Sequence, residues 1–421
     1  MTAAIDMADK APCPNRRTLS VTPAPANGPG AMLKHGSASD RADEAPAGPV
    51  QPGADKSGPP RILEIGGGAL FARIYPETTV RVWTNSHVDR SLAPHLTPWG
   101  WNNLVRAFRL ARAGEIDLIV WHELPYAPWD PRYLFRIVTK LGPLAVPLLI
   151  KYLASFAIIL AARRPLVVID AGDYVCVPRH TMWVMGRAAR TFKRELPFDR
   201  WRLLSGTLHP RQPTGRLRNS RRLKATLDRI RPISLGATWS PDPLLPRPAA
   251  EKRVDVFFAG NIAANSTVRD DGVGELEQLR ARGYVIDIAT ERLSRAEFYD
   301  RCAASWLVWS PEGHGWECFR HYEVPLCGSV PLINRPPINR YAPLEHGVHC
   351  ILYEVEPRGL ARAVEAALAD KTRLAEIAKA GHSFVLQHHT LERGCAYILA
   401  ESGWSPRAAP ATGEVPRAAG G

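Results

Sequence analysis

Short apolar runs alternate with segments of helical periodicity along most of this chain. Parallel strands need a long crossover between them, usually a helix, so this alternation is typical of a parallel α/β sheet. In the first half the pattern predicts one helix at 104–113 and strands at 61–65, 79–83, 116–121 and 166–169.

A proline-dense segment, Pro241–Pro248, separates this half from a second one with the same pattern. Its expected strands are Val254–Phe258, Val285–Ala289, Trp306–Trp309 and Val330–Ile333. Its expected helices are Gly274–Arg282, Ser294–Ala303, Cys318–Cys327, Leu360–Leu368 and Lys371–Gln387. The fold class is therefore α/β, with two Rossmann-like domains facing across a cleft, and such a cleft is a common place for ligands.

The domain boundaries follow from length and composition. At 421 residues the chain exceeds a usual single domain. Residues 1–60 are rich in Pro, Gly, Ala and Ser and bury too little apolar surface to offset their ordering entropy, so a disordered tail is expected. A first folded domain is expected at 61–240, a second at 241–402, and a second disordered tail at 403–421.

Cysteine usage and the N-terminal pattern bear on the compartment. The seven cysteines form no C-x-x-C pair, so the sequence indicates neither a disulfide framework nor a zinc site. Reduced, buried thiols fit a cytoplasmic location. The first residues lack the charged, apolar and small regions of a signal peptide. We therefore expect a cytoplasmic protein.

The most apolar stretch is Leu141–Ala162, which holds Lys151 near its middle. Its unbroken part, Tyr152–Ala162, is about half of the roughly 20 apolar residues that a spanning helix needs. The stretch predicts either a buried core helix or a helix lying at a membrane surface, anchored there by Arg163 and Arg164.

The positive charge of the chain is concentrated in one segment. The formal net charge is +13, and the segment Arg179–Arg231 holds 15 Lys and Arg residues against three Asp and Glu residues. This is either a solvated basic face or a surface for anionic lipid, for a lipid-pyrophosphate or for an acidic glycan. Aromatic residues are not interleaved at regular spacing, which disfavours nucleic acid. A peripheral position at the inner face of the membrane would fit the lipid alternative.

The stretch Ser310–Ile333 carries the strongest functional signal. It reads S-P-E-G-H-G-W-E-C-F-R-H-Y-E-V-P-L-C-G-S-V-P-L-I, a glycine-bearing loop followed by a predicted helix and strand. Backbone N–H groups at such a turn suit an anion, and Arg320 adds a fork of donors for phosphate. Glu323 lies on the same helix face and can accept hydrogen bonds from ribose hydroxyls. Diphosphate plus ribose describes a nucleotide-sugar.

This order of loop, R-x-x-E, Cys-Gly and Pro-aliphatic resembles the donor-binding segment of GT-B glycosyltransferases. The group 1 and spore-maturation-type enzymes are the nearest in pattern, and the exostosin-like enzymes are more distant. A later stretch, Ala380–Arg393, reads A-G-H-S-F-V-L-Q-H-H-T-L-E-R and resembles the end of that family's C-terminal domain. There the resemblance implies that the chain crosses back to brace the first domain, with His388 and His389 in structural roles.

The resemblance implies a glycosyltransferase that performs hexosyl or related transfer. Its donor would be a nucleotide-sugar, and its acceptor a glycan, a lipid-linked molecule or another envelope component, as in polysaccharide biosynthesis. No cofactor is implied, because the nucleotide-sugar is a substrate, and no bound metal is expected.

Residues of the second half supply the expected donor site. Gly260 and Asn261 end the strand Val254–Phe258, and a glycine there lets the backbone approach a phosphate closely. Many group 1 enzymes carry two glutamates with seven residues between them, but Gly315 stands at the first of these positions, so Glu312 or Glu317 is left to contact the sugar. The candidate donor-binding residues are Gly260, Asn261, Glu312, Gly313, His314, Gly315, Arg320 and Glu323.

The acceptor side is expected at the ends of two buried strands of the first half. His122 and Glu123 follow one strand, and Asp170 and Asp173 follow the next. An enzyme that inverts configuration needs a general base for the acceptor hydroxyl, and these four are the catalytic candidates. The run Phe192–Glu195 resembles the first domain of the spore-maturation-type relatives, and its Lys-Arg pair would reach a pyrophosphate.

Two other functions stay open. Ile62–Gly68 reads I-L-E-I-G-G-G and resembles the first motif of S-adenosylmethionine-dependent methyltransferases. However, Leu70 stands where that motif usually continues with glycine, and Asn85 ends the next strand where an acidic residue should hold the ribose. The other alternative is a non-catalytic GT-B scaffold in glycan assembly, which the missing first glutamate would suit.

Overall fold

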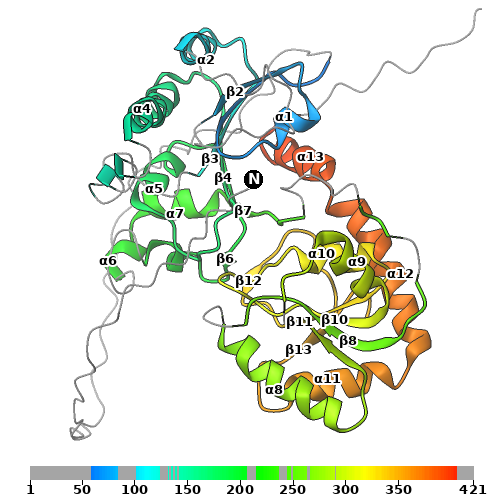
Figure 1. Cartoon of the computed structure of the whole chain (residues 1–421). Helices are drawn as coiled ribbons and strands as arrows, with labels where there is room; N and C mark the ends of the chain where they lie inside the picture. Colours follow the sequence, from blue (N-terminus) through cyan, green and yellow to red (C-terminus); the bar gives the residue numbers. More distant parts are fainter. Residues whose placement is uncertain are drawn as a thin grey trace, which may run out of the picture. The chain divides into compact units, whose positions relative to one another are not determined.

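The computed structural model describes the following residues: 58–83, 101–123, 131, 134–135, 138–139, 142–205, 215–236, 244–247, 250–262, 266–289 and 291–404 (Figure 1). All of the described residues belong to one compact unit, which lies within Gln51–Gly421. Most of the two predicted tails, 1–60 and 403–421, therefore lies outside the described residues.

The first half forms a six-stranded parallel sheet in the order β2-β1-β3-β4-β5-β7. Its strands are β1 Ile62–Gly66, β2 Thr79–Trp83, β3 Leu118–His122, β4 Leu166–Asp170, β5 Arg190–Lys193 and β7 Ile230–Pro232. The register places Ile62 opposite Thr79 on one side and Leu118 on the other. The four strands expected from the sequence are all present.

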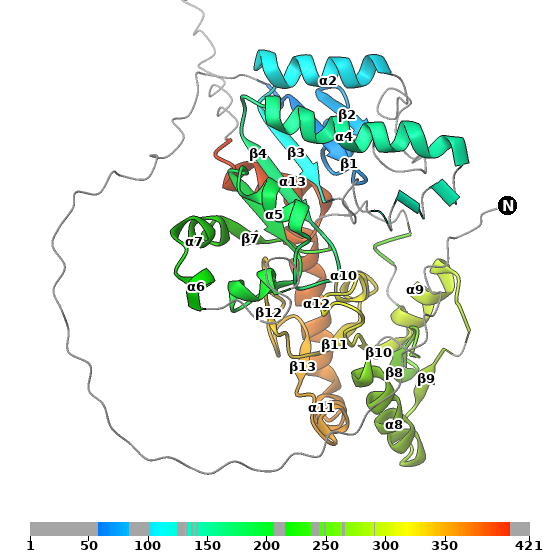
Figure 2. The same ribbon diagram turned by 90° about the vertical axis from the view of Figure 1, so that its left-hand side faces the viewer.

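Alternate residues of these strands feed two separate cores, as the two-residue repeat of a strand requires. Leu63, Ile119 and Val168 point to a core built with α2 Trp101–Ala113, α4 Ala145–Ala161 and α5 Arg179–Met185. Figure 2 shows α2 and α4 side by side on this face. Ile62 and Leu118 point to the opposite core, which α1 Phe71–Ile74 and the C-terminal helix α13 Leu391–Glu401 cover.

The second half forms a five-stranded parallel sheet in the order β13-β11-β10-β8-β9. The strands are β8 Val254–Phe258, β9 Ile286–Ile288, β10 Ser305–Trp309, β11 Val330–Asn334 and β13 Ile351–Tyr353. The helices are α8 Thr267–Ala281, α9 Arg295–Ala303, α10 Arg320–Leu326, α11 Gly359–Leu368 and α12 Lys371–His388. The predicted α/β fold with two Rossmann-like domains is thus confirmed.

Local capping explains where two of these helices begin. The S-x-x-E capping box predicted at Ser294 is present, with the Ser294 and Glu297 side chains each bonded to the other's backbone N–H. The sequence places the start of α8 at Gly274, but the helix begins seven residues earlier. Ser266 caps it there by accepting a hydrogen bond from the Val268 N–H.

Both sheets share one topology that positions a site. In each, the second strand in the chain lies on one side of the first and the third strand on the other. The connections that follow the two neighbouring strands therefore run to opposite sides, at β8 and β10 in the second sheet and at β1 and β3 in the first. We call each of these places a divergence point. In open α/β sheets, ligands bind at such a point, outside the carboxyl ends of the strands.

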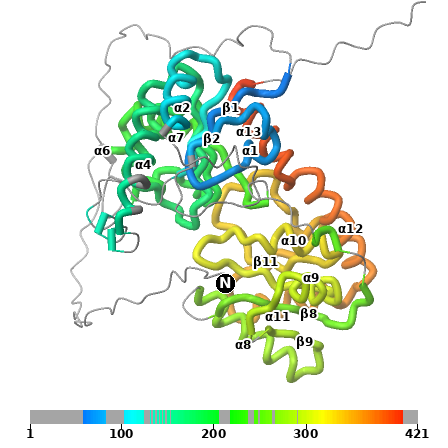
Figure 3. The backbone as a smooth tube through the Cα atoms, turned by 45° about the horizontal axis from the view of Figure 1, so that its top comes forward, coloured from blue at the N-terminus to red at the C-terminus, as the bar shows by residue number. Residues whose placement is uncertain are grey.

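Two segments connect the halves. After α12, which packs on the second sheet, α13 returns to the first and lies beside α1 (Figure 3). This confirms the expected return of the chain. In addition β6 Leu196–Pro197 pairs antiparallel with β12 Ile338–Asn339.

The basic segment Arg179–Arg231 includes two short helices near its end. The short helix α6 Gly215–Arg218 is followed by α7 Arg221–Asp228, which Ser220 caps at its N-terminus. Much of the positive charge in this part of the chain is used internally: Arg229 donates to the Met185 carbonyl, and Arg231 pairs with Glu401. Two 3₁₀ turns, Gly142–Leu144 and Arg200–Leu204, complete the first half.

The apolar helix α4 belongs in part to the core. Its residues Phe156 and Ile159 face the core and are buried, whereas its residues Leu153 and Leu160 are exposed. Lys151 is buried, and that burial lowers the pKa of its ammonium group. Among the described residues, no helix combines the length and the apolar character needed to cross a membrane.

Candidate functional site

A hollow of about 440 Å³ opens where the carboxyl ends of the strands of the second sheet face the first half. From the first half it receives Asp173, Arg194 and Leu235. From the second half it receives Arg269, Phe298, Gly313, His314, Gly315, Glu317, Cys318, Phe319, Arg320 and Glu323. Five of the eight predicted donor-binding residues therefore line one cavity, to which both halves contribute.

Two guanidinium groups stand at the carboxyl ends of β8 and β10. Arg320, the first residue of α10, donates to the Ala259 carbonyl at 2.6 Å and lies over the Phe258 ring. Arg269, in the first turn of α8, donates to the Asn261 carbonyl at 2.7 Å and to the Glu312 carbonyl at 2.8 Å. Burial, and then the positive charge of Arg320, lower the pKa of Arg269. This end of the sheet therefore holds two fixed positive charges.

Gly260 lies against the Arg320 side chain. A Cβ atom added there would lie 2.8 Å from Nη1 of Arg320. The missing side chain thus makes room for the arginine, which in turn reaches the cavity. Asn261 contributes its carbonyl to Arg269. Neither residue lines the cavity itself.

The loop between β10 and α10 is held from within. The Glu312 N–H donates to Asn334 Oδ1 at 2.9 Å, and the Glu312 carboxylate accepts from Asn334 Nδ2 at 3.0 Å. The Gly313 N–H donates to the Gly315 carbonyl, so this amide is already bonded. His314 is exposed at the cavity wall. These bonds give the loop a defined shape.

Glu323 lies one helical turn beyond Arg320, and both line the cavity. The Tyr299 hydroxyl donates to Glu323 Oε1 at 3.1 Å and fixes the carboxylate. The predicted spatial pairing of Arg320 and Glu323 is therefore present.

On the acceptor side, Asp173 is the catalytic candidate that reaches the cavity. Arg194, which follows β5, makes an ion pair with it. The Asp173 side chain keeps 52% of its surface exposed. A half-exposed carboxylate at the cavity wall can accept a hydrogen bond from a hydroxyl group of a second substrate.

Glu123 and Asp170 lie behind this position. Asp170 is fully buried and pairs with Lys193 at 3.0 Å, and Lys193 also donates to the Tyr174 carbonyl. Burial, and then the negative charge of Asp170, hold the pKa of Glu123 well above its usual range. Lys193 is therefore used internally, whereas its neighbour Arg194 reaches the cavity.

His122 is buried beside the glycine turn that follows β1. Its Nε2 lies 2.7 Å from Glu64 Oε1, and Glu64 also accepts from the Leu70 and Ala72 N–H groups. Burial pushes the pKa of Glu64 upward, but His122, the charge of Arg81 and the Ala72 N–H together outweigh burial and lower the pKa. A Cβ atom at Gly68 would clash with the His122 ring, so imidazole fills the space beside the turn.

Sequence reasoning missed Arg269 as a site residue. It appears in the sequence as one arginine before a helix whose start was placed too late, so its proximity to the loop was invisible. The Ser266 cap is the signal that could have found it, because an early helix start places Arg269 in the first turn.

Within the described ranges, no three His, Cys, Asp or Glu side chains are grouped so that they could hold a metal ion.

No family model matches the sequence, and no curated protein matches it. Among solved structures, the chain is similar to HepE from Anabaena crystallised with UDP, at 15% identity, over 81% of this chain and 98% of HepE, with a TM-score of 0.44. It is also similar to a glycosyltransferase from Rickettsia africae ESF-5, at 10% identity, over 81% and 97% of the two chains, with a TM-score of 0.45. A third is sucrose-phosphate synthase from Thermosynechococcus elongatus, at 11% identity, over 80% and 97%, with a TM-score of 0.44. The strand order of the chain itself defines its fold.

Proposed function

We propose that the protein is a glycosyltransferase of the group 1 or spore-maturation kind. It would transfer a sugar from a nucleotide-sugar to a glycan, a lipid-linked molecule or another envelope acceptor. The observation that carries this proposal is the pair of guanidiniums, Arg269 and Arg320, at the divergence point of the second sheet. Glu323 stands on the same wall, and Asp173 faces it from the first half.

The donor would lie with its diphosphate against the two arginines. Their positions are fixed by carbonyl groups and by the Phe258 ring before any ligand arrives, so little reorganisation is needed when negative charge develops on the leaving diphosphate. An arginine fork matches phosphate oxygens in geometry as well as charge. Glu323, oriented by Tyr299, would accept from the ribose hydroxyls.

The acceptor hydroxyl would approach from the first half. If configuration is inverted, a base must remove its proton, and Asp173 is the one of the four predicted carboxylate and imidazole candidates that lines the cavity. Arg194 keeps Asp173 in place. Glu123 and Asp170 would support this wall from behind, and His122 would support the turn after β1.

Binding of nucleoside diphosphates tests the proposal. A thermal-shift panel of the full chain should include uridine, guanosine and thymidine diphosphates. We expect one of them to raise the melting temperature, and we expect Arg320→Ala, Arg269→Ala and Glu323→Ala each to reduce that rise while the protein stays folded. A diphosphate at 100 times its Kd stabilises by about 2.7 kcal/mol. Unchanged shifts in all three variants would refute the site.

Adding S-adenosylhomocysteine to this panel separates the glycosyltransferase from the methyltransferase and the non-catalytic scaffold. S-adenosylhomocysteine should give no shift, because the His122 ring occupies the space beside Gly68 that a methyltransferase cofactor would need. A shift with this ligand would favour the methyltransferase. No shift with any ligand would favour a non-catalytic scaffold.

The membrane remains the proposed location of the acceptor. The exposed basic residues of the segment Arg179–Arg231 include Arg221 and Arg222 at the start of α7. Adjacent positive charges on a surface attract anionic lipid headgroups within about a Debye length. A cytoplasmic protein with such a face would sit at the inner face of the membrane.

A further inference from the structure

A short segment of the first half reaches across to the loop between β10 and α10. This crossing segment, residues 194–197, follows directly from β5, and its last two residues form β6, which pairs with β12 of the second half. Asn339 on β12 adds a hydrogen bond from its Nδ2 to the Pro197 carbonyl at 3.1 Å. The crossing segment is therefore anchored at both of its ends.

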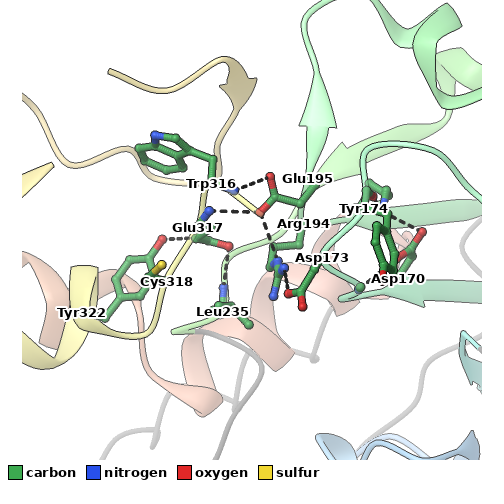
Figure 4. A network of polar contacts seen from close by, with 12 residues as sticks. Asp170, Asp173, Tyr174, Arg194, Glu195, Leu235, Trp316, Glu317, Cys318 and Tyr322 are labelled. Carbon is green, nitrogen blue, oxygen red and sulfur yellow. Dashed lines mark hydrogen bonds and ion pairs between the residues drawn. The ribbon is translucent and has the colours of Figure 1, made fainter. Parts of the chain in front are cut away.

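Glu195 is the residue of this segment that engages the loop (Figure 4). It is 1% exposed. Its carboxylate accepts from the Trp316 N–H at 3.1 Å and from the Glu317 N–H at 3.0 Å. Arg194 lies 3.3 Å away and balances the charge. A buried carboxylate with two backbone donors and a guanidinium fixes the loop backbone strongly.

The loop also contributes a carboxyl group that accepts a hydrogen bond from the first half. Glu317 Oε2 accepts from the Leu235 N–H at 3.0 Å, and Leu235 follows β7 at the end of the first half. The Tyr322 hydroxyl donates to the other oxygen. Each half thus satisfies backbone donors of the other, and both contacts meet at Glu317.

The loop has a glycine where the crossing segment presses against it. A Cβ atom at Gly315 would lie 2.6 Å from Glu195 Oε1 and 2.9 Å from Arg194 Nη2. Gly315 also accepts the hydrogen bond from the Gly313 N–H that closes the turn carrying His314. The shape of the cavity wall therefore depends on where Glu195 stands.

We infer that Glu195 is a positioning residue through which the first half of the chain sets the loop 313–317 in its ligand-binding shape. The loop forms no bond to Glu195 unless the two halves are assembled, so the donor site is complete only in the assembled protein. The consequence for a nucleoside diphosphate rests on the proposed function, whereas the positioning of the loop does not.

Hydrogen exchange tests the positioning directly, without ligand. In Glu195→Ala we expect the amides of Trp316 and Glu317 to exchange at least about tenfold faster, because both lose their acceptor. Glu195→Gln keeps one acceptor oxygen, so its exchange rates at Trp316 and Glu317 should lie between those of the wild type and those of Glu195→Ala.

A matched control is available in the second half. Glu275 accepts from the Arg358 N–H at 2.9 Å and from the Ala361 N–H at 2.8 Å, a bridge of the same kind that lies away from this cavity. Glu275→Ala should speed exchange at those two amides and leave Trp316 and Glu317 unchanged. Should Glu195→Ala prove unstable, Gly315→Ala perturbs the same contact from the loop side.

Binding of uridine, guanosine and thymidine diphosphates then tests the consequence. We expect Glu195→Ala to weaken the bound diphosphate by about tenfold, or roughly 1.4 kcal/mol, and Glu275→Ala to leave it unchanged. Unchanged exchange at Trp316 and Glu317 in a folded Glu195→Ala protein would overturn the inference, and so would equal losses of affinity in both variants. If the wild-type protein binds no diphosphate, the proposed function fails, and the exchange data still decide the inference.

Discussion

The carboxyl group of Glu317 should make stability fall as pH rises through the neutral range. Full burial raises its pKa to about 8, and the hydrogen bond from Tyr322 and the charge of Arg194 only partly oppose this. Glu195 lies beside it and adds a repulsive negative charge. Glu317 is therefore protonated in the folded protein at pH 7 and ionised in the unfolded chain.

The sign follows from proton linkage. Between the ordinary carboxyl pKa of 4.5 and the folded value of about 8, the folded state binds one more proton than the unfolded state. The stabilisation associated with this proton is complete below 4.5 and is lost as pH rises through 8. The loss is at most about 1.4 kcal/mol per pH unit, or roughly 2–3 kcal/mol between pH 6 and pH 8.

Glu317→Gln isolates this effect, because an amide does not titrate and has the shape of the neutral carboxyl group. Urea unfolding of the wild type and the variant, followed at pH 6, 7 and 8, gives a stability difference at each pH in which the other titrating groups cancel. We expect the free energy of unfolding of the variant, relative to that of the wild type, to rise by roughly 2–3 kcal/mol from pH 6 to pH 8.

Tyr322→Phe provides a second check on the same group. The Tyr322 hydroxyl lowers the pKa of Glu317, so its removal should move the loss of stability to higher pH. A stability difference between the wild type and Glu317→Gln that is constant from pH 6 to pH 8 would refute the reasoning. It would mean that Glu317 is ionised throughout and that its burial is balanced by its partners.

Two further predictions concern α8 and the basic surface. In α8, Gly272→Ala should destabilise the protein by about 1–3 kcal/mol, because the new Cβ would clash with the buried Trp309 ring. Gly274→Ala, with no atom within 4 Å of its Cβ, should instead stabilise by about 0.5–1 kcal/mol. If the urea midpoints of Gly272→Ala and Gly274→Ala moved in the same direction, the placement of α8 would be contradicted. In a flotation assay, the protein should bind vesicles of anionic lipid at low salt and lose binding at high salt, and Arg221→Glu with Arg222→Glu should weaken it. Equal binding to neutral vesicles would contradict an electrostatic surface.

Local sequence signals were sufficient for most of the second sheet. Apolar runs such as Val254–Phe258 are long enough and bounded clearly enough to identify buried strands, and the box at Ser294 identifies a helix start. The spacing of Arg320 and Glu323 already places both side chains on one helix face. These features depend on neighbours a few residues away, so the sequence alone determines them.

The first half of the site required the tertiary structure. His122, Glu123, Asp170 and Asp173 all follow buried strands, and nothing in their local sequence distinguishes the one that lines the cavity from the ones that are covered. The position of each depends on side chains far along the chain, such as Glu64 for His122 and Lys193 for Asp170.

The sequence by itself determined two α/β domains, and its resemblance to GT-B enzymes predicted the return of the last helix and a set of donor-site residues. Only the tertiary structure decided that Arg269 joins Arg320 and that Glu195 holds the loop of the other half. Trp316 is 121 residues from Glu195 along the chain, and such contacts form when burial removes water from both partners. Local periodicity carries no information about that pairing, because it depends on how the two sheets meet.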